Sequence, residues 1–98
     1  MSASSVVLRG IDARTFSEME SFVKDLEARP VERLLRDLHE LVELPITKVS
    51  LVSYVIHAKF RAVEAEEKAK MRDSVAATYE ATVGEAKERV GQILDRLR

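Results

Sequence analysis

The feature that most restricts the fold of this chain is a seven-residue repeat of apolar side chains in its second half. The repeat runs from Leu51 to Leu97 in alternating steps of four and three residues, and Arg72 is the one member that is not apolar. Such a repeat places its side chains along one side of an α-helix and is typical of coiled coils and helical bundles. No proline follows Pro45. The sequence therefore predicts one continuous helix from about residue 48 to 97, roughly 75 Å long at the α-helical rise per residue.

An alternative prediction is a break near residues 70–74, which would give a compact four-helix bundle. Asp73 and Ser74 are residue types that cap the N-termini of helices. However, neither glycine nor proline lies at residues 70–74, although turns between antiparallel helices usually contain one. The repeat also keeps its phase through this stretch. The continuous helix is therefore the preferred prediction.

The first half of the chain predicts two shorter helices that fold into a hairpin. The first runs from about residue 13 to 28, with Asp12 as a candidate N-cap. Residues 15–18 also fit a capping box, which would start this helix a few residues later. The second begins at Pro30, because proline is favoured in the first turn of a helix, and ends near residue 43 before Pro45. The apolar stripe predicted for the first helix consists of Phe16, Met19, Phe22, Val23 and Leu26.

These elements predict an all-α protein with three segments. Residues 1–11 are expected to be a flexible N-terminal tail. Residues 12–63 form the helical hairpin and the first part of the long helix, where the hairpin packs. Residues 64–98 form a C-terminal helix for oligomerisation or partner binding. Because the hairpin helices are too short to cover that last segment, its apolar repeat is expected to face another chain.

Composition argues against several function classes. The 16 Lys and Arg residues are balanced by 17 Asp and Glu residues, so the basic excess of a DNA-binding protein is missing. There is no cysteine, which excludes disulfides, thiolate catalysis and cysteine-ligated zinc. The two histidines, His39 and His57, lack the neighbouring ligands or acids that a metal site or a hydrolase needs. We predict no enzymatic activity, no cofactor and no bound metal.

The predicted function is that of a helical protein–protein interaction module, such as an adaptor, scaffold or assembly subunit. The expected partner is a second copy of the chain, another helical protein, or both. An alternative is a small dimeric regulator associated with nucleic acid. No segment predicts membrane insertion, and a cytoplasmic location is expected. The predicted interface, called here the C-terminal seam, consists of Ala69, Arg72, Ala76, Tyr79, Val83, Ala86, Val90, Ile93 and Leu97.

Arg72 is the polar member of the C-terminal seam and allows two interpretations. Its guanidinium can extend past a small neighbour to reach water while its stem stays in the apolar surroundings. It can instead pair with a carboxylate of a partner and so select the register of the complex. In an analogous way, the ring of Tyr79 is expected either in a core with its hydroxyl at the edge or as an anchor in an interface.

Overall fold

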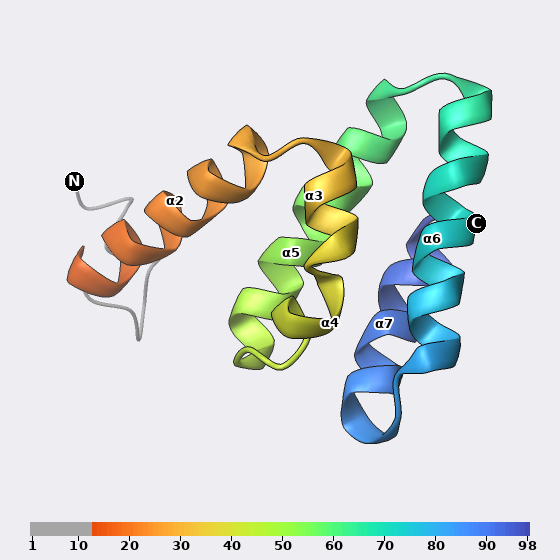
Figure 1. Cartoon of the computed structure of the whole chain (residues 1–98). Coiled ribbons are helices and arrows are strands. Elements are labelled where there is room, and N and C mark those ends of the chain that lie inside the picture. The colour runs from red at the N-terminus through yellow and green to blue at the C-terminus, as the bar shows by residue number, and fades with distance from the viewer. Residues whose placement is uncertain (1–12) are drawn as a thin grey trace.

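The computed structural model describes residues 13–98, which form six helices joined by short turns (Figure 1). No strand occurs within this range, so the predicted all-α fold is confirmed. The predicted tail, residues 1–11, and the candidate cap Asp12 lie outside the described residues. In chain order the helices are α2 (Ala13–Ala28), α3 (Val31–Arg36), α4 (Leu38–Leu41), α5 (Ile46–Ala62), α6 (Ala65–Ala81) and α7 (Gly84–Arg96).

Helix α2 has the bounds that the sequence predicted. It ends before Pro30, whose extended backbone (φ −60°, ψ 152°) precedes α3. Leu26, at the C-terminal end of the predicted apolar stripe, is fully buried, whereas Phe22 and Val23 are partly buried against the core. The stripe therefore packs on the protein only over the second half of the helix.

The segment predicted as one helix over residues 30–43 is divided in two at Asp37. The backbone stays close to helical there, because the Asp37 N–H donates to the carbonyl of Arg33 and the Leu41 N–H donates to the carbonyl of Asp37, each at 3.0 Å. The Asp37 carboxylate accepts a hydrogen bond from Nη1 of Arg29 at 3.2 Å. Aspartate is a weak helix former whose side chain readily bonds elsewhere, and here it joins the end of α3 to the segment between α2 and α3.

The predicted continuous helix over residues 48–97 is wrong. The chain turns at residues 63–64 and again at 82–83, so that α5, α6 and α7 fold back on one another (Figure 1). The longest dimension of the molecule is 43 Å, well short of the length that an unbroken helix would have. The alternative break at residues 70–74 is also wrong, since this stretch lies within α6.

Local chemistry explains where the second turn falls. Thr78 and Thr82 each donate a side-chain hydrogen bond to the carbonyl four residues earlier, an arrangement that bends helices and weakens them slightly. Thr82 and Val83 are β-branched and adopt extended backbone angles. Gly84 follows with φ +67°, a left-handed conformation that glycine adopts without the steric cost of a side chain. The first turn, at Val63 and Glu64, contains neither glycine nor proline.

Burial explains why the folded-back arrangement is preferred. Each backbone hydrogen bond lost at a turn is replaced by bonds to water and costs about 1 kcal/mol net. Each Val, Leu, Ile or Met side chain that becomes fully buried contributes about 1.5–3 kcal/mol. Folding α7 against α6 and α5 buries Val75, Val90, Ile93 and Leu97 almost completely, and an isolated straight helix would leave them in water.

One hydrophobic core joins the first and last helices. Helix α7 packs on both α6 and α5, α3 packs on α5 and α6, and α2 packs on α5. Figure 1 shows α2 leaning away from the hairpin of α6 and α7, at the opposite end of the molecule. The most deeply buried side chains are Leu26, Leu34, Leu38, Val42, Val52, Val55, Ile56, Met71, Val75, Val90, Ile93 and Leu97.

Candidate protein-interaction site

Four residues at the C-terminal end of the seam lie inside the chain's own core. Ala86, Val90, Ile93 and Leu97 are buried, with at most 8% of their surface exposed. They face α5 and α6 because the turn at residues 82–83 brings α7 back onto these helices. In this structure these four residues are covered by the protein itself and present no surface to another chain.

The remaining seam residues are scattered. Ala69 is exposed on α6, and Ala76 is half-buried there. Val83, at the tip of the turn between α6 and α7, is 82% exposed. Since the tip is separated from Ala69 by most of α6, the exposed members do not form one continuous patch.

Arg72 makes contacts within the chain. Its Nη1 donates to the carbonyl of Leu97 at 3.3 Å, and its guanidinium carbon lies 5.6 Å from the centre of the Phe60 ring. The positive charge therefore sits at the C-terminal end of α7, where unpaired carbonyls favour a cation. Arg72 thus fastens the end of α7 to α6 and α5.

Tyr79 is half-buried between α6 and α7, and its environment explains one of the glycines. A Cβ atom added at Gly91 would lie 3.0 Å from Cε1 of Tyr79, which is tighter than normal van der Waals contact. The ammonium of Lys87 lies 4.4 Å from the centre of the same ring. Gly91 therefore lets the two helices approach closely around the tyrosine.

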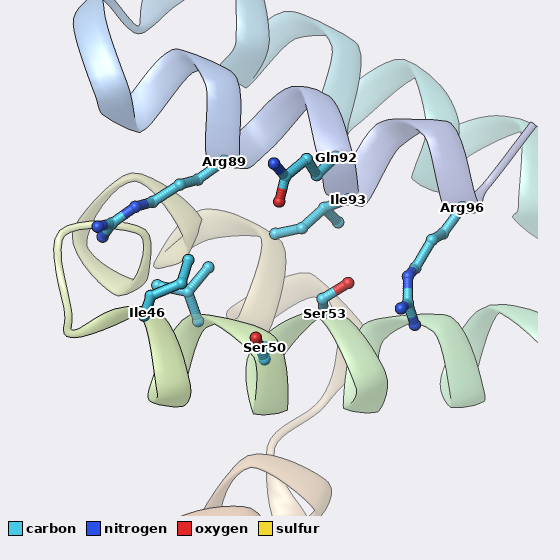
Figure 2. A pocket seen from close by; sticks show the side chains of 8 residues that line it. Ile46, Ser50, Ser53, Arg89, Gln92, Ile93 and Arg96 are labelled. Atoms are coloured by element: carbon cyan, nitrogen blue, oxygen red, sulfur yellow. The ribbon is translucent and has the colours of Figure 1, made fainter.

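A small cleft lies between α5 and α7 (Figure 2), with a volume of about 90 Å³. Ser50, Ser53, Gln92 and Arg96 supply its polar groups. Arg89 extends from it toward the turn before α5, where Nη1 donates to the carbonyls of Val42 and Leu44 at 2.9 and 2.7 Å. Its Nη2 pairs with Glu85 at 2.8 Å. The charge of Arg89 is thus used to hold α7 to that turn and is not directed at a ligand.

The described residues contain no candidate metal site. Within residues 13–98, no group of three or more histidine or acidic side chains could hold a metal ion. His39 is exposed on α4, and His57 is half-buried on α5. None of the helices over this range combines the length and apolar character needed to cross a bilayer.

The most distinctive surface feature is an open apolar groove between α2 and α5, called here the α2–α5 groove, with a volume of about 430 Å³. Phe16 lies at one end and is 43% exposed. Tyr54, 59% exposed, stands on α5 one turn beyond the lining residue Leu51. The groove is lined by Phe16, Met19, Glu20, Val23, Lys24 and Glu27 of α2 and Leu51 of α5.

The two walls of the groove are held together at the C-terminal end of α2. Leu26 is buried in the common core. Nζ of Lys59, on α5, donates to the carbonyl of Glu27 at 2.9 Å, and the ammonium of Lys48 lies 5.4 Å from the centre of the Phe22 ring. These contacts preform the groove, which lowers the ordering cost that a binding partner would meet.

Comparisons of this chain with protein-family models, with curated proteins and with solved structures found no match. The case for a function therefore depends on the geometry of the chain alone.

The sequence predicted the apolar residues of α2 but not the groove that they form. Phe16, Met19 and Val23 were predicted as part of the face that α2 buries. The structure leaves Phe16 exposed and the other two only half-buried, because α3 has only six residues and packs on α5 and α6 rather than along α2. The lengths of α3 and α4 would have indicated that α2 stays partly uncovered, because these two helices together are too short to cover both α2 and α5.

Proposed function

We propose that this chain is a non-enzymatic protein–protein interaction module whose docking surface is the α2–α5 groove. One observation carries the proposal: apolar side chains from two helices form an open groove whose walls are fixed by core contacts. The groove brings the apolar side chains of Phe16, Met19 and Val23 together on one face, and hydrophobic binding grooves of this kind accept the apolar face of a partner. Its concave shape suits an amphipathic helix, which would complete a three-helix arrangement with α2 and α5.

The rest of the fold supports this role as a scaffold. The C-terminal seam, which the sequence predicted as the interface, instead supplies core contacts that fix α5 in position. Arg72 and Arg89 fasten α7 to the helices around it. A folded helical body that carries an apolar groove is the arrangement expected of an adaptor or assembly subunit, in which affinity comes from a few apolar anchors.

Photo-crosslinking tests the proposal. A photoreactive amino acid is placed at Glu20, which lines the groove and is exposed, and in a control protein at Ser21, which is exposed on another side of α2. The two proteins are irradiated in cells. We expect protein adducts of defined mass from position 20 at several times the yield from position 21. Phe16→Ala should lower the yield at position 20, because it removes an anchor from the groove wall. Equal yields at the two positions would contradict the proposal.

A further inference from the structure

We infer that the occupant of the α2–α5 groove is the same groove of a second copy of this chain, with the two α2 helices antiparallel. This inference rests on the proposed function, since it names the partner of that site. The resulting dimer would be isologous, so that each copy offers the same patch to the other. Three features of the described residues lead to it.

The first feature is the match between the groove and α2 itself. The groove needs a short apolar helix face, and α2 presents one over the two turns from Phe16 to Val23. This face is only partly used within the chain, as the exposure of Phe16 shows. A second α2 placed in the groove would cover the apolar α2 faces of both copies at once. An unrelated partner would cover the face of one copy only.

The second feature is the charge pattern on the rim of the groove. Glu20 and Lys24 lie one turn apart on this rim, yet neither forms an ion pair with any residue between 13 and 98. Consider two antiparallel α2 helices whose two-fold axis passes at the level of Phe22 along the helix. Glu20 of each copy then lies opposite Lys24 of the other. Two symmetric ion pairs result. The same register sets Glu27 opposite Ser17, so like charges do not meet.

The third feature is access. Helix α2 lies at one end of the molecule, away from the α6 and α7 hairpin (Figure 1). A second copy can therefore approach α2 from that end without meeting α6 or α7. The number of apolar anchors is small, which places the contact at the lower end of interface sizes, and we expect a dissociation constant on the order of micromolar.

Analytical ultracentrifugation of the full chain, over about 1 µM to 1 mM, tests this arrangement. The wild-type chain is expected to show a reversible monomer–dimer equilibrium. Lys24→Glu makes all three charged residues of the groove lining acidic, because Glu20 and Glu27 are acidic already. Glu20→Lys leaves two basic residues and one acidic residue. Each variant alone should dimerise at least about tenfold more weakly, because like charges then meet across the two-fold axis. Glu88→Lys, an exposed change on α7, is the matched control and should leave the equilibrium unchanged.

The decisive sample is an equal mixture of the Lys24→Glu and Glu20→Lys chains. In the antiparallel register a mixed pair again joins opposite charges, so a heterodimer of near wild-type affinity is expected. Circular dichroism confirms that each variant keeps its helix content. Recovery of dimer affinity in the mixture supports two points together: the partner is a second copy of the chain, and the two α2 helices pair in the antiparallel register.

Other outcomes overturn the inference and separate it from the proposed function. A wild-type chain that stays monomeric at all concentrations rules out the second copy. If neither charge reversal changes the dissociation constant of the dimer, the contact lies elsewhere on the surface, and the inference is also overturned. In either case the adduct at position 20 decides the proposed function: an adduct whose mass fits a different protein retains it, and the absence of an adduct removes it as well.

Discussion

Helices α2 and α7 both carry an apolar stripe, but only that of α7 is fully covered. Helix α7 turns back on α6, an antiparallel neighbour of similar length, and also contacts α5, so Val90 and Ile93 lose nearly all contact with water. Helix α2 is followed by the short helices α3 and α4, and in its N-terminal half Phe16 is exposed and Met19 only half-buried. The comparison shows that a stripe of the same period becomes core or surface according to the length of the elements that follow it.

Changing Val90 to aspartate should have the largest effect on stability. Val90 is fully buried in the core that joins α2 to α7, and an unpaired charge there leaves the folded state destabilised by more than about 4 kcal/mol. We expect the whole chain to unfold, and not only α7. Urea denaturation followed by circular dichroism measures this. The control is Phe16→Asp, which should change the free energy of unfolding by less than about 1 kcal/mol. A folded Val90→Asp chain would show that α7 is separable from the core.

Replacing Arg89 with methionine should have the next largest effect. The methionine keeps most of the apolar stem but leaves the carbonyls of Val42 and Leu44 without their donor. Leaving these two partly buried acceptors without their charged donor should cost about 2–3 kcal/mol, measured by urea denaturation. The exposed Arg96 supplies a control, since Arg96→Met removes a charge from α7 with little loss of stability. Equal effects of the two substitutions would contradict the role given to Arg89.

Gly91→Ala should destabilise the hairpin of α6 and α7 by about 1 kcal/mol. Alanine favours a helix over glycine by about 1 kcal/mol, but its Cβ meets the Tyr79 ring, and overpacking costs typically 1–3 kcal/mol. Thermal unfolding measures the net result. Adding Tyr79→Leu should make Gly91→Ala neutral or stabilising, because the clash is gone. A stabilising effect in the wild-type background would show that the ring moves aside freely.

Phe16→Ser should have the smallest effect on folding and a large one on association. Phe16 is partly exposed at the end of the groove, so its loss should change the free energy of unfolding by about 0.5 kcal/mol or less. Binding at the groove should weaken severalfold, as expected for an anchor. Ultracentrifugation and urea denaturation on the same samples separate the two effects. If stability fell as far as association, Phe16 would belong to the core of α2 and not to a docking surface.

The sequence predicted the parts of the fold that local chemistry controls. Pro30 and Pro45 marked helix boundaries correctly, and the bounds of α2 followed from its stripe. The turn at Val63 and Glu64 was missed because Ala62 and Ala65 on its two sides keep the phase of the seven-residue repeat. Gly84 lies inside the stretch that was predicted as one helix, but its positive φ places it at the start of a new helix, α7. Local chemistry at Thr82, Val83 and Gly84 permits the second turn, and packing energy favours the folded-back chain over the straight helix.

The sequence predicted less of the candidate site than of the fold. The C-terminal seam was selected because no helix in the chain was expected to cover it, and that expectation depended on the continuous helix. Once α7 folds back, the uncovered apolar stripe is that of α2. The pattern shows which residues are apolar, but three-dimensional arrangement decides which of them meet water.

The turn at Thr82, Val83 and Gly84 has a consequence for how the chain reaches its native state. Because it joins two adjacent helices, the many contacts between α6 and α7 form across short stretches of sequence, which is a low contact order and favours rapid folding. The contacts of α2 with α5 close a longer loop of chain. We therefore expect the α6 and α7 hairpin to be structured in the folding transition state, and the groove to be completed late, when α2 docks.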